Sequence, residues 1–132
     1  MMKTTKSTIS LAARWLSAAL VFAAAQAGAQ DAQRGEKLFT DCRACHTLQP
    51  AVHNVGPSLA GVVGRKAGSA EDFRYSPAMK RSGLTWDPAT LSAFIADPQA
   101  VVPGNRMPYS GMPNAKDVSD LLAYLAKAGA GN

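Results

Sequence analysis

The residues best suited to chemistry in this chain are two cysteines and a histidine that lie within five positions. Cys42 and Cys45 are three residues apart and His46 follows directly, in the order Cys-x-x-Cys-His. Two thiols on one helical turn can both reach a porphyrin edge and add across its two vinyl groups. The imidazole that follows then lies beneath the ring, with a nitrogen available to the iron. The spacing therefore predicts one haem c, attached covalently through Cys42 and Cys45, with His46 as an axial ligand.

Three other kinds of site share the cysteine pair and fit the sequence less well. A thioredoxin-type redox pair opens a helix after a buried strand, and no alternating β–α pattern surrounds Cys42. A structural zinc site needs a second pair of ligands, and His53 is the only other histidine or cysteine in the chain. A simple disulfide leaves His46 without a role. Haem attachment is the interpretation that uses all three side chains.

Three segments that could position this motif have the pattern of helices. The first begins after the capping residue Asp31 and runs to about Cys42. The second begins at Asp87-Pro88 and stops at Asp97-Pro98. The third follows Asn114 and ends at Gly129, and a short helical turn is a further candidate at residues 77–81. The apolar stripe of the third helix is formed by Val118, Leu121, Leu122 and Leu125.

Glycine- and proline-rich loops connect these helices, and no long alternating strand is present. Loops of such length are uncommon in a small domain, but they are understandable if they wrap a cofactor. Gly35 lies inside the first helix, where glycine costs about 1 kcal/mol relative to alanine. A close crossing with another helix would explain that cost. The predicted fold class is therefore all-α, with loops that wrap a covalently attached haem.

The N-terminal residues have the pattern of an export signal. Lys3, Lys6 and Arg14 precede an apolar stretch at residues 16–25, and Ala27-Gly28-Ala29 offers a small-x-small cleavage site. The apolar stretch is about half the length that a bilayer span requires. We therefore predict a signal peptide at residues 1–29 and export to the periplasm, with an uncleaved N-terminal anchor as the alternative.

Removal of the signal changes the charge of the protein. The chain has fourteen Lys and Arg against nine Asp and Glu, and three of the basic residues lie in the signal, which leaves a net charge of +2. The remaining basic residues are scattered and are not interleaved with aromatic residues, so no nucleic acid is expected as a partner. Residues 30–132 have the length of one small domain.

The second axial ligand must come from this domain. Met107 lies in Pro-Gly-Asn-Arg-Met-Pro, where an extended, proline-stiffened loop can present a thioether at a fixed distance. Met112 has a similar Gly-Met-Pro setting, whereas Met79 falls in the short helical turn and is expected to pack in the core. We expect Met107 to be the ligand, with Met112, His53 or an open sixth position as alternatives.

From about Gly35 to Lys127 the chain resembles the class I cytochromes c, the mitochondrial and bacterial electron carriers. The resemblance implies a fold in which the N- and C-terminal helices cross and loops wrap the haem. The matching segments occur in the family's order: Gly-Glu-Lys-Leu-Phe, Cys-x-x-Cys-His-Thr, Val-Gly-Pro-Ser-Leu-x-Gly-Val-Val-Gly-Arg-Lys, Phe-Arg-Tyr-Ser, Gly-Leu-Thr-Trp, Asp-Pro, Pro-Gly-Asn-Arg-Met and Asp-Leu-Leu-Ala-Tyr-Leu.

The resemblance also implies roles for individual residues. The backbone carbonyl of Pro57 would accept the N–H of His46 and fix its ring. Gly35 and Tyr124 would meet where the first and last helices cross. Four further side chains would contact or screen the buried haem propionate, because a buried carboxylate without hydrogen-bond donors is very costly. These side chains are those of Arg65, Tyr75, Trp86 and Asn105.

Five positions depart from the family pattern. Phe94 replaces a tyrosine that donates to the methionine sulfur, and Met79 replaces an asparagine near the buried propionate. Asp41, Gln99 and Ala100 replace lysines that surround the exposed haem edge in mitochondrial forms. We therefore expect docking to an acidic partner to be weaker and less dependent on salt than in those forms.

The function predicted is one-electron transfer by a soluble, periplasmic, monohaem cytochrome, and not catalysis. With both axial positions filled, the iron has no vacancy for a substrate. The expected partners are donor and acceptor proteins that dock transiently at the haem edge. We expect a monomer with no membrane span after signal cleavage. The alternatives are a dedicated cytochrome subunit bound to a periplasmic dehydrogenase, and a haem-based sensor or peroxidase with a weak sixth ligand.

Overall fold

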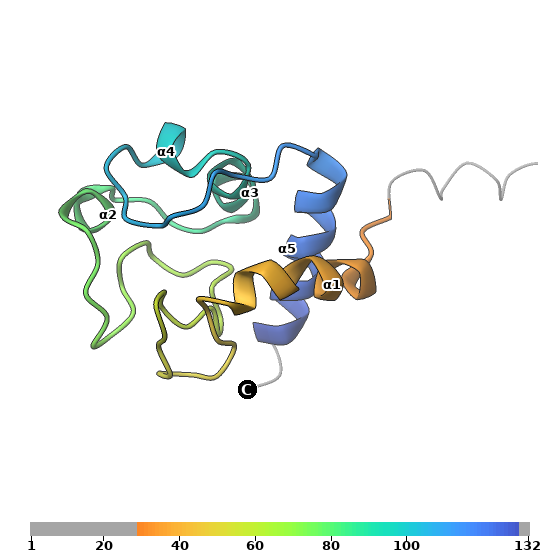
Figure 1. The fold of residues 1–132 in the computed structure, drawn as a ribbon, viewed down its shortest axis with the longest axis horizontal. Helices are drawn as coiled ribbons and strands as arrows, with labels where there is room; N and C mark the ends of the chain where they lie inside the picture. Colours follow the sequence, from red (N-terminus) through yellow and green to blue (C-terminus); the bar gives the residue numbers. More distant parts are fainter. Residues whose placement is uncertain (1–28, 130–132) are drawn as a thin grey trace, which may run out of the picture.

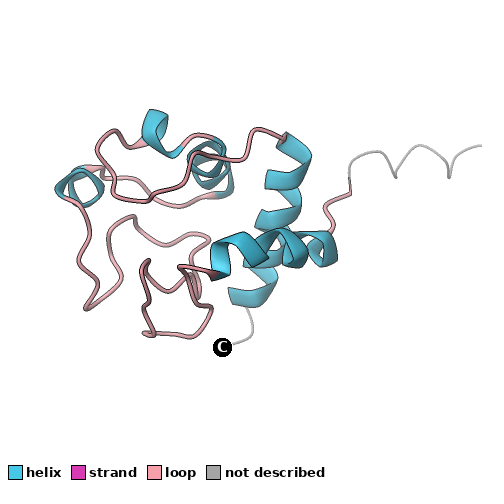
Figure 2. Cartoon of the chain, in the orientation of Figure 1, coloured by secondary structure: helices cyan, strands magenta, loops and turns pink. Residues whose placement is uncertain are grey.

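A computed structural model describes residues 29–129 of the chain, which are helices joined by long loops (Figure 1). Figure 2 shows no strand in this part, where β pairing is limited to a single bridge between Lys66 and Thr85. Within it, no helix is both long enough and apolar enough to cross a lipid bilayer. Residues 1–28 of the predicted signal peptide lie outside the described part. The helices are α1 (Ala32–Arg43), α2 (Pro77–Arg81), α3 (Pro88–Ala96), α4 (Pro98–Val101) and α5 (Ala115–Gly129).

The helices begin at side chains that cap their free N–H groups, as the sequence predicts. The Asp31 carboxylate accepts from the N–H groups of Gln33 and Arg34 at 2.9 and 3.0 Å. Asp87 accepts from the N–H of Thr90 at 2.9 Å at the start of α3. These caps confirm the predicted starts of α1 and α3, because each satisfies donors that the first turn of a helix leaves unpaired.

One helix was not predicted. The second predicted helix does stop at Asp97-Pro98, but Pro98 opens α4 directly afterwards. Asp97 follows the last residue of α3 and accepts from the N–H of Ala100 at 3.1 Å, so it also caps α4. A proline ends one helix and suits the first turn of the next for the same reason, since it lacks an N–H to donate.

The first and last helices, α1 and α5, cross each other (Figure 1), and Gly35 lies at their contact. A Cβ built on Gly35 would lie 2.0 Å from the backbone oxygen of Asp120 and 2.9 Å from Cβ of Tyr124. Only a residue without a side chain allows the two backbones to approach so closely. Beside the crossing, the rings of Phe39 and Tyr124 are 5.4 Å apart. The predicted close crossing at Gly35 is thus confirmed.

A buried carboxylate reinforces this crossing. Asp120 of α5 is fully buried, and its oxygens accept from the N–H of Asp31 at 2.8 Å, from Arg34 Nη1 at 2.7 Å and from Lys116 Nζ at 2.5 Å. The Lys116 ammonium and the Asp31 N–H hold the pKa of this carboxyl well below its usual range. Because its donors come from both helices, Asp120 ties the start of α1 to α5.

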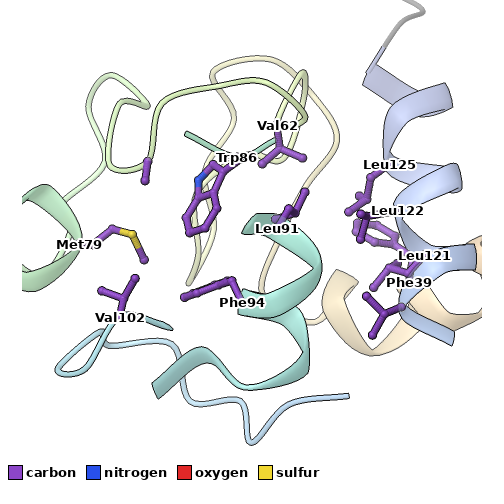
Figure 3. Packing of buried hydrophobic residues seen from close by; sticks show 12 residues of the cluster. Phe39, Val62, Met79, Trp86, Leu91, Phe94, Val102, Leu121, Leu122 and Leu125 are labelled. Atoms are coloured by element: carbon purple, nitrogen blue, oxygen red, sulfur yellow. The ribbon is translucent and has the colours of Figure 1, made fainter. Parts of the chain in front are cut away.

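Figure 3 shows the core in two parts. One part lies between α1 and α5, where Phe39 packs near Leu121, Leu122 and Leu125. The other lies among the loops, where the side chains of Met79, Trp86, Phe94 and Val102 point toward one another from α2, α3 and the segments beside α3 and α4. The loop part of the core is the side on which a cofactor would be wrapped.

Candidate haem-attachment site

The two cysteines lie at the end of α1. Cys42 is in the last turn of the helix, and its carbonyl accepts from the N–H groups of Cys45 and His46 at 3.0 and 2.9 Å. Both thiols are free and half-buried. Burial raises the pKa of the Cys42 thiol, and the nearby Asp41 carboxylate raises it further. A reactive redox cysteine has a lowered pKa instead, so the structure argues against the thioredoxin-type alternative.

The imidazole of His46 is held in one tautomer. Its Nδ1 lies 2.7 Å from the carbonyl oxygen of Pro57. A carbonyl can only accept, so Nδ1 carries the hydrogen and Nε2 keeps a free lone pair, which is the form that binds a metal. Burial lowers the pKa of His46, although the bond to Pro57 opposes this effect. The ring is therefore neutral and available as a ligand near pH 7.

Gly56 allows the loop to cover this ring. A Cβ built on Gly56 would lie 2.3 Å from Cε1 of His46, so the backbone rests directly on the imidazole. The N–H of Gly56 also donates to the carbonyl of Cys45 at 2.8 Å. The segment that supplies Pro57 is thus fastened to the cysteine motif itself.

Arg65 has a donor that the chain does not satisfy. Its Nη1 and Nη2 donate to the carbonyls of Ala60 and Ser58 at 3.0 and 2.9 Å. Its Nε, by contrast, is buried and is the one buried side-chain nitrogen or oxygen without a partner in residues 29–129. An unpaired buried N–H costs about 1–3 kcal/mol, so a native acceptor is expected there. A haem propionate is an acceptor of the required charge.

Backbone pairing brings Trp86 beside Arg65. The N–H of Trp86 donates to the carbonyl of Arg65 at 2.8 Å, and the N–H of Gly64 donates to the carbonyl of Trp86 at 2.7 Å. The Trp86 ring is buried against Phe94, with centroids 4.8 Å apart. Tyr75 comes from the neighbouring loop, and its hydroxyl accepts from the N–H of Ala70 at 3.2 Å, which leaves its own hydrogen free to donate.

Asn105 has a role that the sequence reasoning missed. Its Nδ2 donates to the carbonyls of Pro98 and Val102, each at 2.9 Å, and its Oδ1 accepts from the N–H of Met107 at 2.9 Å. Both of its N–H groups are therefore used by the backbone of its own loop. The asparagine shapes the turn that presents Met107, and the Gly-Asn dipeptide two residues before the methionine is the signal that could have indicated it.

The two loop methionines are held differently. Both are half-buried against the core. The N–H of Met112 donates to the carbonyl of Ile95 at 2.9 Å, and a Cβ on Gly111 would lie 2.1 Å from the oxygen of Ala96. The backbone of Met112 is therefore joined to the end of α3, whereas the backbone of Met107 is hydrogen-bonded within its own loop, to the Asn105 side chain and to the N–H of Tyr109.

The other two candidates are occupied elsewhere. Met79 is buried in the core, as predicted. Nε2 of His53 lies 2.7 Å from the carbonyl oxygen of Glu71, and Nδ1 of His53 accepts from the N–H of Ser58 at 3.0 Å. Ligation by His53 would require at least one of these bonds to break.

Together, these features fit a haem attached at the end of α1. The site offers two free thiols, an imidazole with a free Nε2 lone pair, a loop thioether and a buried N–H that needs an acidic acceptor. No group of three or more His, Cys, Asp or Glu side chains in residues 29–129 could hold a metal ion alone, which argues against the zinc alternative.

Comparisons with known proteins agree with the fold and the site. The family model described as cytochrome c matches residues 32–129. Cytochrome c2 of Rhodomicrobium vannielii is 49% identical over 110 residues, which cover 83% of this chain and 88% of that protein. Cytochrome c2 of Rhodoblastus acidophilus is 51% identical over 100 residues, covering 75% and 94%. The solved structure of cytochrome cH from Methylobacterium extorquens superposes with a TM-score of 0.70 at 48% identity, covering 74% of this chain and 98% of that one.

The crossed helices and the haem-attachment site define an electron-transfer protein of the class I cytochrome c fold. The chain belongs to the cytochrome c family. It carries haem c attached through Cys42 and Cys45, and it transfers electrons and is not an enzyme.

Proposed function

We propose that this protein is a periplasmic one-electron carrier in which His46 and Met107 ligate the haem iron. The observation that carries the proposal is the hydrogen bond between His46 Nδ1 and the Pro57 carbonyl, because it leaves Nε2 free as a ligand at the attachment motif. When bound, the haem supplies one-electron chemistry, with iron that changes between the ferrous and ferric states.

The residues of the chain orient the two proposed ligands of the iron and keep the surroundings of the haem apolar. Pro57 orients the imidazole and increases its basicity toward the metal. Asn105 holds the backbone of Met107 in place, so that little conformational entropy is lost when the thioether binds. A thioether ligand in apolar surroundings favours the ferrous state, which predicts a relatively high reduction potential.

The buried donor of Arg65 supports the placement of a propionate. Its Nη groups are fixed by two carbonyls, so Nε points in one direction without flexibility. Trp86 and Tyr75 complete this side with a buried indole and a hydroxyl whose hydrogen is free. A carboxylate in such a setting is stabilised by charge-assisted hydrogen bonds.

The buried Phe94 has no hydroxyl and cannot donate to a methionine sulfur. We propose that the Met107 sulfur therefore accepts no hydrogen bond from position 94.

One preparation tests the proposal. The full chain is expressed with the haem-attachment machinery, and the periplasmic holoprotein is analysed by mass spectrometry and by the spectrum of its oxidised form. We expect a mass that corresponds to cleavage after Ala29 plus one haem. We also expect a sulfur–iron band near the red edge of the visible spectrum, lost in Met107→Ala and kept in the matched control Met112→Ala. Loss of the band only in Met112→Ala would refute the ligand assignment, and an uncleaved membrane-bound product would refute the location.

A further inference from the structure

Charged residues are distributed very unevenly along this chain. Residues 44–64 contain no Asp, Glu, Lys or Arg, and residues 98–115 contain only Arg106. The described part of the chain has 101 residues and twenty charged side chains. The two segments contain 39 of these residues but only one of the charged side chains. With charges spread evenly, about eight would be expected in them. We call the surface of these two segments the neutral face.

Each segment of the neutral face contains a residue that we propose as a ligand of the haem iron. The first continues from α1 (yellow in Figure 1), contains Cys45 and His46, and is joined to Cys45 by the N–H of Gly56. The second contains Met107, which is partly buried against the same core as Cys42. The charge-poor segments are thus the ones that carry the proposed ligands of the redox group.

The neutral face also contains the exposed large apolar side chains of the described chain. Val52 is 44% exposed and Val55 is 67% exposed. Their loop is held in shape, because the N–H of Val52 donates to the carbonyl of Gln49 at 3.3 Å and the N–H of Asn54 donates to the carbonyl of Gly56 at 3.0 Å. Apolar groups presented on a fixed backbone lose little entropy when a partner covers them.

The chemistry of this surface matches the centre of a protein interface. Such centres are depleted in charged residues, and apolar contacts there supply most of the affinity. A surface with so few charges gains little from opposite charges on a partner, and a charged partner face would lose hydration on contact with little compensation. With a net charge of +2 after signal removal, the protein also has little long-range attraction for an acidic partner.

We infer that the neutral face is the docking surface of this carrier, and that it fits a redox protein whose own docking face is uncharged and apolar. Val52 and Val55 provide the apolar contact. This inference rests on the proposed function, since it concerns where electrons leave and enter a carrier.

Two blue copper proteins of opposite surface chemistry serve as probes. One has an uncharged apolar patch over its copper site, and the other has an acidic patch. The second-order rate of their reduction by the ferrous holoprotein is measured from about 0.01 M to about 1 M salt, over which the Debye length falls from about 30 Å to about 3 Å. We expect the wild type to reduce the apolar probe faster than the acidic one. Its rate with the apolar probe should change less than about twofold across this range.

Variants separate apolar contact from charge. In Val52→Lys/Val55→Lys the rate with the apolar probe should fall about tenfold, and the rate with the acidic probe should rise and become dependent on salt. Val55→Ser should slow the apolar probe without accelerating the acidic one. The control Ala126→Lys adds the same kind of charge at an exposed position of α5, outside the neutral face, and should leave the apolar probe unaffected.

The outcomes also distinguish this inference from the proposed function. Wild-type rates in Val52→Lys/Val55→Lys, or a wild type that prefers the acidic probe and slows steeply with salt, would overturn the docking inference. The reduction potential and the sulfur–iron band are measured in each variant. If a variant keeps the wild-type reduction potential but reduces the probes at a different rate, the substitution has changed only docking at the neutral face. A wild type without reversible one-electron reduction would contradict the function itself.

Discussion

The helix crossing at Gly35 allows a stability change to be worked out from the structure. In Gly35→Ala the new methyl group would lie 2.0 Å from the backbone oxygen of Asp120, whereas ordinary contact begins at 3.4 Å. The two helices would have to move apart by about 1.4 Å, and no side-chain rotation can relieve a clash with backbone atoms. The separation would also loosen the packing of Phe39 and Leu121, each 1% exposed.

The expected magnitude is the difference between two effects. Overpacking at a rigid contact costs about 3 kcal/mol, and alanine regains about 1 kcal/mol over glycine within a helix, for a net loss of about 2 kcal/mol. In a domain of about 100 residues this lowers Tm by about 8–16 °C. The measurement is thermal and guanidinium unfolding of the holoprotein, followed by circular dichroism.

A matched control lies at the next position of the same helix. Glu36 is exposed, so Glu36→Ala should change stability by less than about 0.5 kcal/mol. A Gly35→Ala holoprotein as stable as the wild type would show that the crossing is looser than the structure indicates, and the reasoning would fail.

Two further predictions concern backbone strain and a buried charge. Ala51 has a φ of 57°, a region unfavourable for residues with a Cβ, so Ala51→Gly should stabilise the protein by about 0.5 kcal/mol; a lower guanidinium midpoint would contradict this. The pKa of Asp120 is lower in the folded protein than its ordinary value of 3.8, so its contribution to stability is complete above about pH 4 and is lost as the pH falls below that value. Asp120→Asn should therefore be less stable than the wild type at pH 7 and lose less stability between pH 5 and 2, whereas parallel pH profiles would show that this carboxylate is not coupled to folding.

Much of the fold could be predicted because its signals are local. Asp31 and Asp87 cap helices within three residues of themselves, and the stripe on α5 repeats at helical spacing. α4 was missed because Pro98 indicates the end of one helix and the start of another equally well. Whether the chain continues or turns there depends on what surrounds it.

By itself, the sequence determined that two thiols and an imidazole share one turn, and hence that a haem can be attached. The spacing of three residues along a chain is sufficient for that conclusion. The tertiary structure decided the surroundings of the candidate site residues. The tautomer of His46 is set by a carbonyl eleven residues away, the turn before Met107 by the bonds from Asn105 to the carbonyls of Pro98 and Val102, and the unpaired donor of Arg65 by burial among loops. These properties depend on contacts between separate segments and on the exclusion of water, which no local pattern of residue types records.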